Sequence, residues 1–146
     1  MPDDKDIVVI NDNEWKDLDF KALKDVSKKY FDKHLKGQVV TNENNNAIII
    51  LAKRGWYHTF YNNIVDYETV VIFKELIKVI KRAEFIGFGD RNKKDSKSTL
   101  GYLNYLNNVL INNKVYVQVN ISIRIDIIGN FYYDHYIKKK SPPLYR

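Results

Sequence analysis

The sequence has no cysteine and only three prolines and six glycines among 146 residues. Without cysteine, disulfide bonds, thiolate nucleophiles and cysteine-based zinc sites are excluded. No apolar run approaches the ~20 residues that a membrane-spanning helix needs, and the acidic start does not resemble a signal peptide. We therefore expect a soluble, cytoplasmic protein without membrane contact. Delivery as part of a larger toxin or phage protein stays open.

Glycine-rich and metal-binding motifs are also absent. Gly87 and Gly89 flank a phenylalanine, but the third glycine of a phosphate-binding loop is missing. No two histidines have the spacing of metal ligands, and the second half of the chain has too few acids for a two-metal nuclease. Ser98-Thr99 carries no signature of a nucleophile. We expect no metal and no cofactor.

Charge is unevenly distributed along the chain. The first 20 residues contain seven acids and two bases, whereas the remainder contains 11 acids and 22 bases, for a net charge of +6. We assign residues 1–12 to an acidic tail with an edge segment at Ile7–Ile10, and residues 13–146 to a single domain. A basic body suggests a polyanionic partner such as RNA or DNA, although a lysine-rich surface is often simply solvated.

The C-terminal third predicts three antiparallel strands. Lys114–Ile127 alternates apolar and polar residues and is rich in β-branched side chains, which is typical of a strand with one buried face. Asn112-Asn113 before it and Gly129-Asn130 after it are residues that form hairpin turns. The flanking strands are then Gly101–Ile111 and Phe131–Lys138.

The length of the second turn decides which residues share the polar face. A two-residue turn at Gly129-Asn130 pairs Arg124 with His135 and Asp126 with Tyr133, and we favour this register. A three-residue or bulged turn would shift the pairing by one position and present a different set: Tyr132, Asp134 and Tyr136.

The N-terminal half predicts helices and short strands. Apolar residues at helical spacing follow Asp12 or Asn13, either of which is a plausible N-cap, and Gly37 ends the helix; a break near Asp17–Asp19 would divide it in two. Two short strands are expected at Gln38–Thr41 and Ala47–Ala52, followed by a loop at Trp56–Asn63. A second helix begins at Asp66 or Tyr67, and a charged loop follows at Asp90–Ser98. The fold class is α+β, with N-terminal helices packed on a curved antiparallel sheet of about four strands that ends in β-hairpins.

Histidine, arginine, tyrosine and threonine are the candidates for chemistry. His58 follows a buried strand, in a position where loops often carry function, although it could equally be a structural histidine stacked on Trp56. His135 lies on the polar face beside Arg124 in the favoured register, and His34 is interpreted as a surface residue. Such a set of residues can promote cleavage of RNA by attack of the RNA's own 2′-hydroxyl, because a base and an acid transfer protons while cations stabilise the charge on phosphorus.

The hairpin segments Lys114–Val119 and Phe131–Ile137, together with the loop containing His58, resemble a known group of nucleases. They are similar to phage-associated domains of the Barnase–EndoU–colicin–RelE superfamily, which occur in phage polyvalent proteins and in polymorphic or contact-dependent toxins. The resemblance covers residues 37–140 and implies a metal-independent endoribonuclease, often directed at tRNA. It also implies a cognate immunity or antitoxin protein for toxin members.

The residues carried over from the resemblance agree in part with those expected from the sequence pattern. His58 and Thr59 match a loop whose polar residues are catalytic candidates in the family, and His135 matches the histidine of the last strand. No glutamate lies on the expected open face, so either one of the two histidines is the base or the domain is catalytically weak. The complete expected site consists of His58 and His135 as the acid/base pair, Arg124 with Arg54 or Lys53 as phosphate ligands, Thr59 and Tyr133 as positioning donors, and Tyr102 and Tyr116 as base-stacking rings. The alternative is a non-catalytic phage accessory or interaction module of the same fold that binds nucleic acid or a host protein.

Overall fold

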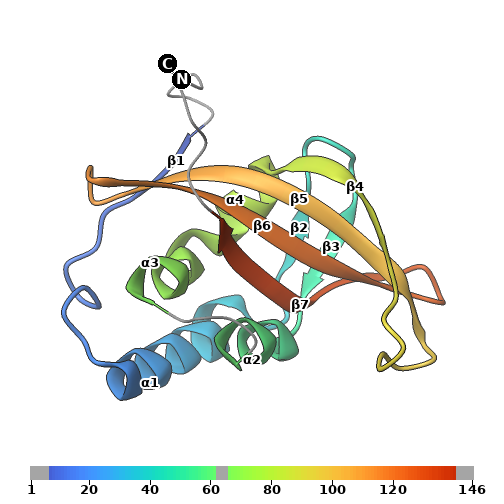
Figure 1. The fold of residues 1–146 in the computed structure, drawn as a ribbon, viewed down its shortest axis with the longest axis horizontal. Helices are drawn as coiled ribbons and strands as arrows, with labels where there is room; N and C mark the ends of the chain where they lie inside the picture. The colour runs from blue at the N-terminus through green and yellow to red at the C-terminus, as the bar shows by residue number, and fades with distance from the viewer. Residues whose placement is uncertain (1–6, 62–65, 141–146) are drawn as a thin grey trace.

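The computed structural model describes residues 7–61 and 66–140 (Figure 1). Within these ranges, seven strands form one sheet in the order β1-β5-β6-β7-β3-β2, with β4 also paired to β5. The strands are β1 Ile7–Ile10, β2 Val39–Thr41, β3 Ile48–Leu51, β4 Glu84–Asp90, β5 Thr99–Ile111, β6 Val115–Asp126 and β7 Phe131–Lys140. The helical elements are α1 Phe20–Tyr30, the π-helical turn η2 Phe31–Leu35, α2 Lys53–Tyr61, α3 Tyr67–Val70, the 3₁₀ turn η3 Val71–Glu75 and α4 Leu76–Arg82.

The sheet is larger than expected, and it is mixed. Helices do pack on a sheet as predicted, and Figure 1 shows α1, α2 and α3 gathered on one side of it. The prediction of about four antiparallel strands was wrong, however, because β1 pairs parallel with β5 and β3 pairs parallel with β7. The strand β4 was not predicted, since glycines at positions 87 and 89 weaken its strand signal. No helix in the described part of the chain is long and apolar enough to cross a membrane.

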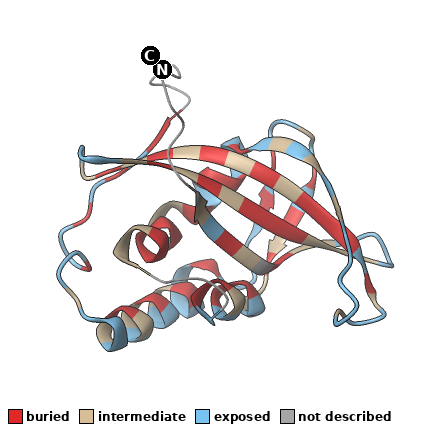
Figure 2. Cartoon of the chain, in the orientation of Figure 1, coloured by how far each residue is buried: buried red, intermediate tan, exposed pale blue. Residues whose placement is uncertain are grey.

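The hairpin of β5 and β6 is the centre of the sheet and was predicted correctly. Its turn residues Asn112 and Asn113 have φ values of 54° and 59°, which asparagine tolerates better than most residues. Along β6 the β-branched residues are buried in alternation, with Val119, Ile121 and Ile123 at 0% exposure. Figure 2 shows this alternation as buried bands along the strands, and buried residues on the helices where they face the sheet. The core therefore lies between the helices and one face of the sheet.

The pairing of β6 with β7 differs from the favoured prediction. Residues 127–130 form the turn, Arg124 lies opposite Tyr132, and Ser122 lies opposite Tyr136. Between these pairs one residue of β6 faces three of β7, so β7 is bulged. The bulge turns Tyr133 into the core at 0% exposure and brings Asp134 to Arg124. The two-residue register was wrong, and two residues of the bulged alternative, Tyr132 and Asp134, contact Arg124 instead.

The first helix begins later than predicted. Its N-cap is Asp19, whose side chain accepts a hydrogen bond from the amide of Ala22. Asp12 also accepts hydrogen bonds from backbone amides two and three residues ahead, yet no helix follows it. The predicted break at 17–19 is thus followed directly by the true start of α1. The helical run of α1 and η2 ends at Leu35, and its predicted end at Gly37, which has φ 82°, was correct.

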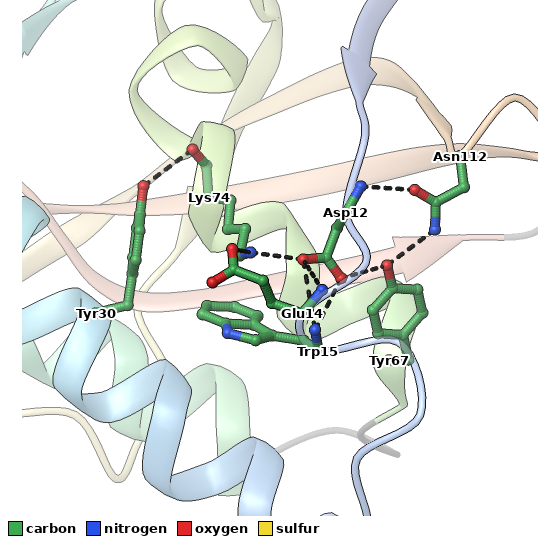
Figure 3. Close-up of polar contacts among 7 residues, drawn as sticks. All are labelled: Asp12, Glu14, Trp15, Tyr30, Tyr67, Lys74 and Asn112. Carbon is green, nitrogen blue, oxygen red and sulfur yellow. Dashed lines mark hydrogen bonds and ion pairs between the residues drawn. The ribbon is translucent and has the colours of Figure 1, made fainter.

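Asp12 instead anchors the N-terminal segment to the rest of the protein (Figure 3). Its fully buried carboxylate accepts hydrogen bonds from Lys74 Nζ at 2.5 Å and from the Tyr67 hydroxyl at 2.7 Å. The side chain of Asn112 donates to that hydroxyl and accepts from the Asp12 amide. Burial and the hydrogen bond to Asp12 raise the pKa of Tyr67 to about 12, so the phenol remains a donor. This cluster ties β1 to the β5–β6 turn and to η3.

Candidate functional site

Helix α2 presents one face to the core and the other to solvent. The prediction of a loop over Trp56–Asn63 was wrong for residues 56–61, which belong to α2, and residues 62 and 63 lie outside the described ranges. Gly55, Trp56, Thr59 and Phe60 are buried, with spacings of three and four residues that place them on the inner side of a helix. The intervening residues Arg54, Tyr57, His58 and Tyr61 therefore share the outer side. Packing against β7, rather than intrinsic propensity, accounts for a helix in a segment that contains a glycine and is rich in aromatic residues.

The contact between α2 and β7 is close and polar. A Cβ atom at Gly55 would lie 2.5 Å from the backbone oxygen of Tyr133, so only glycine fits here. Thr59 Oγ1 accepts a hydrogen bond from the Ile137 amide at 2.7 Å and lies 2.8 Å from the Tyr133 hydroxyl. Burial raises the pKa of Tyr133, which keeps its hydroxyl protonated. These contacts fix α2, and hence His58, relative to the bulged strand.

A cleft of about 420 Å³ opens beside α2. Its walls come from segments that are distant in the sequence, namely the outer side of α2, the ends of β5 and β6, the bulge of β7 and the loop between β4 and β5. The lining residues are Arg54, His58, Lys94, Asp95, Ser96, Ser98, Thr99, Tyr102, Arg124 and Asp134. Three cations, two carboxylates, one imidazole and several hydroxyls thus meet in a single concave site.

Arg124 is held in a defined orientation within this cleft. Its Nε donates to Asp134 Oδ2 at 2.7 Å, and its guanidinium lies 4.9 Å from the centre of the Tyr132 ring. Asp134 is 5% exposed, whereas the Arg124 side chain is 20% exposed. Among the described residues, the terminal nitrogens of Arg124 donate no hydrogen bond to protein atoms. A guanidinium fixed through Nε can offer these nitrogens to a phosphate in bidentate geometry.

Burial and nearby charges together set the pKa of His58. Burial lowers the pKa of His58, and the nearby Arg54 lowers it further, whereas Asp134 and Asp95 act in the opposite direction. The net result is a neutral imidazole at neutral pH, the form that accepts a proton. Asp95 is itself held by the Tyr102 hydroxyl, which donates to it at 2.6 Å. Burial and this hydrogen bond raise the pKa of Tyr102.

Four of the residues selected from the sequence line the cleft together: Arg54, His58, Tyr102 and Arg124. Thr59 and Tyr133 lie behind them at the α2–β7 contact, at 1% and 0% exposure. Tyr102 is 5% exposed, so the expectation that its ring stacks on bases at an open surface is not met. In this position it holds Asp95 at the cleft wall.

The other selected residues lie elsewhere or outside the described side chains. Lys53 forms an ion pair with Asp32 at 2.7 Å and does not line the cleft. Tyr116 lies eight residues along the hairpin from the Tyr102–Arg124 pair, a separation of about 26 Å. The backbone of His135 belongs to β7 next to Asp134, but its side chain lies outside the described residues.

Sequence reasoning also missed several residues of this region. Asp134 appeared only in the bulged alternative. Asp95 lay in the predicted loop Asp90–Ser98, which was expected to influence specificity, but it was not selected as a site residue. Tyr57 and Tyr61 are exposed on α2, with ring centres 4.6 Å apart. The spacing of Trp56, Thr59 and Phe60 was a usable helix signal that would have placed both tyrosines outside.

Comparison with known proteins identifies the family. The family described as "Large polyvalent protein-associated domain 3" matches residues 19–133. The chain belongs to this family. The match confirms the link to phage polyvalent proteins, whereas membership of the nuclease superfamily is not shown by it. No curated protein and no solved structure matches the chain. The family match includes α2 and β6, with His58, Arg54 and Arg124, and ends one residue before Asp134.

Proposed function

We propose that this domain is a metal-independent endoribonuclease that acts on RNA in the cleft beside α2. The observation that carries the proposal is the convergence of His58 from α2 and Arg124 from β6 on one concave site, together with Arg54. An uncharged imidazole that shares a cleft with two guanidinium groups is suited to a phosphodiester, because the cations bind the phosphate and the imidazole accepts a proton.

In the proposed reaction His58 removes the proton of a ribose 2′-hydroxyl. The 2′ oxygen then attacks the adjacent phosphorus and displaces the 5′ oxygen of the next nucleotide, which leaves a 2′,3′-cyclic phosphate. Arg54 and Arg124 stabilise the additional negative charge on the phosphoryl oxygens. The leaving oxygen takes a proton from a second group, for which His135 remains the expected residue.

The carboxylates of the cleft have a supporting part in this scheme. Asp134 and Asp95 both raise the pKa of His58 and so favour the imidazolium that forms when the proton is transferred. Asp134 also orients Arg124 through the contact with Nε. A base that is neutral before the reaction and stabilised as a cation during it is the arrangement that proton transfer needs.

The test is cleavage of total RNA and of purified tRNA by the isolated protein in the presence of EDTA. We expect fragments with 2′,3′-cyclic phosphate ends. General base catalysis contributes about 10²- to 10⁴-fold, so His58→Ala should lower the cleavage rate by at least about 100-fold. His135→Ala should have a comparable effect. The matched control is His34→Ala, since His34 is exposed on η2 and contacts only the Tyr30 ring among the described aromatic rings.

Two results would remove the assignment. One is the absence of RNA cleavage by the wild-type protein in EDTA and in the presence of divalent cations. The other is equal cleavage by the wild type and His58→Ala, which would mean that the observed activity belongs to a contaminant or to another site.

The second candidate is a non-catalytic module of the same fold that binds nucleic acid. It is favoured by the excess of bases over acids after residue 20, which does not by itself require a reaction. This function predicts RNA affinity that falls steeply with salt and no product. A cognate immunity or antitoxin protein would need an acidic surface to complement this domain, and it remains a prediction of the ribonuclease proposal.

A further inference from the structure

The outer side of α2 continues beyond the cleft as an exposed aromatic surface. Tyr57 is 57% exposed and Tyr61 is 45% exposed, whereas their helical neighbours Trp56 and Phe60 are buried in the core. Tyr57 is three residues after Arg54 and next to His58, and the centres of the Tyr57 and His58 rings are 6.4 Å apart. The surface formed by the two tyrosines is therefore adjacent to the cleft.

Helix α1 adds positive charge on the other side of these rings. The ammonium of Lys24 lies 4.8 Å from the centre of the Tyr61 ring. Lys21, Lys24 and Lys28 are three and four residues apart, so they share one face of α1. Together with Asp19 and Asp25 they line a shallow hollow of about 580 Å³ along that helix, where the three lysines outnumber the two carboxylates. Contacts between Phe20 and Phe60 show that α1 and α2 pack side by side, as Figure 1 also shows.

Together these residues form a continuous surface, which we name the α1–α2 track and define as Tyr57, Tyr61, Lys21, Lys24 and Lys28. Lys24 covers one side of the Tyr61 ring and Tyr57 lies against that ring as well, so Tyr57 presents the more accessible aromatic surface. Exposed rings beside lysines are the combination that binds single-stranded nucleic acid, because bases stack on the rings and phosphates contact the cations.

We propose that the α1–α2 track binds single-stranded RNA and guides it into the cleft beside α2. An unpaired base stacks on Tyr57, Tyr61 supports that ring from behind, and the lysines of α1 contact the phosphates that follow. Bases in a duplex have no free face for such stacking, so the track selects unpaired segments. The inference deepens the proposed function and rests on it, since it specifies the class of RNA that reaches His58.

The experiment measures binding rather than cleavage, by fluorescence anisotropy at low salt. His58→Ala is introduced into every protein so that the RNA stays intact. The three probes are a labelled oligouridine, an abasic ribose-phosphate strand of the same length, and an RNA duplex of the same length. Stacking of one base corresponds to a change in Kd of about 5- to 150-fold, so Tyr57→Ala should weaken oligouridine binding within that range. Tyr57→Phe should retain wild-type affinity, because it keeps the ring.

The controls separate the track from general effects. Binding of the abasic strand should not change in Tyr57→Ala, since that strand has no base to stack. The matched aromatic control is Phe88→Ala, because Phe88 is 75% exposed on β4 and lies outside the track. A second variant, Lys24→Gln with Lys28→Gln, should weaken oligouridine and abasic binding alike and should reduce the salt dependence of Kd.

Several outcomes would overturn the inference. Unchanged oligouridine affinity in Tyr57→Ala would exclude stacking, and equal affinity for oligouridine and duplex would exclude selection of single strands. Absence of binding to all three probes would assign the surface to a different class of partner. Absence of ribonuclease activity would give a different result from absence of the track. In that case RNA would still bind in a Tyr57-dependent manner, but the protein with intact His58 would produce no fragments.

Discussion

Substitution of Gly55 by alanine tests the junction that positions His58. The added Cβ would lie 2.3 Å from Tyr133 Cε2 and 2.5 Å from the Tyr133 backbone oxygen, whereas ordinary contacts lie between 3.4 and 4 Å. The ring could be displaced, but the backbone oxygen belongs to β7, which is held by pairing with β6 on one side and β3 on the other. Helix α2 must therefore move away from β7 by roughly 1 Å to restore normal packing.

The expected magnitude follows from the contacts that such a movement disturbs. Overpacking of a core contact typically costs about 1–3 kcal/mol. The shift also lengthens the two hydrogen bonds of Thr59 with Ile137 and Tyr133, and a buried hydrogen bond contributes about 1 kcal/mol. Alanine is a better helix former than glycine by about 1 kcal/mol, which acts in the opposite direction. We expect Gly55→Ala to lower the free energy of unfolding by about 2–4 kcal/mol.

The assay is urea unfolding followed by tryptophan fluorescence, since both tryptophans, Trp15 and Trp56, are buried. The matched control is Gly89→Ala. A Cβ atom there would lie 3.0 Å from the end of the Asn104 side chain, which can move, so the free energy of unfolding should change by no more than about 0.5 kcal/mol. Addition of Tyr133→Phe to Gly55→Ala should give no recovery, because neither the ring carbons nor the backbone oxygen is removed.

A neutral or stabilising effect of Gly55→Ala would refute this reasoning. It would show that helix propensity dominates at this position, and that α2 does not contact β7 as closely as the structure places it. The position of His58 relative to Arg124 would then lose its support.

Two further predictions concern ionisable groups. Asp12→Asn should destabilise the protein by about 3 kcal/mol, because it removes one partner of a buried ion pair with Lys74. Burial alone would raise the pKa of Asp12, but hydrogen bonds from Lys74 and Tyr67 outweigh it and leave the pKa below its usual value. The stability that Asp12 contributes is therefore present above its unfolded pKa of about 4 and is lost as pH falls through the lower folded pKa. Urea titrations between neutral and acidic pH should show a weaker loss of stability in the variant, and equal pH profiles would contradict this. For His58, burial and then Arg54 lower the pKa, so NMR titration should give a value below about 6.5, and Arg54→Gln should raise it. A pKa that Arg54→Gln leaves unchanged would place that guanidinium outside the site.

Local sequence signals were sufficient to place some helices and strands but not others. The strands β5 and β6 were predicted within a few residues, because alternation of apolar side chains and an Asn-Asn turn are local properties. The helix α2 was missed, since its glycine and aromatic residues are weak helix formers and its stability comes from β7. The start of α1 was misplaced because Asp12 and Asp19 are equally good N-caps, and distant partners of Asp12 decide between them.

The candidate site was predictable only in part for the same reason. The residue types His58, Arg54 and Arg124 could be selected from the sequence, because few other groups in this cysteine-free chain could perform chemistry on phosphates. Their convergence could not be derived, since it depends on the bulge of β7. The expected register placed His135 opposite Arg124, whereas the bulge brings Asp134 to Arg124.

By itself the sequence determined the long central hairpin, the mixture of helices and strands, and the kinds of side chain available for function. These follow from periodicity and from residue conformational preferences within a few positions. The tertiary structure alone decided the parallel pairings of β1 and β3, the register of β7 and the cleft that His58 shares with Arg124. The physical reason is that strand register and close packing are set by contacts between residues far apart in the chain. The same local sequence pattern is compatible with more than one register and more than one packing arrangement.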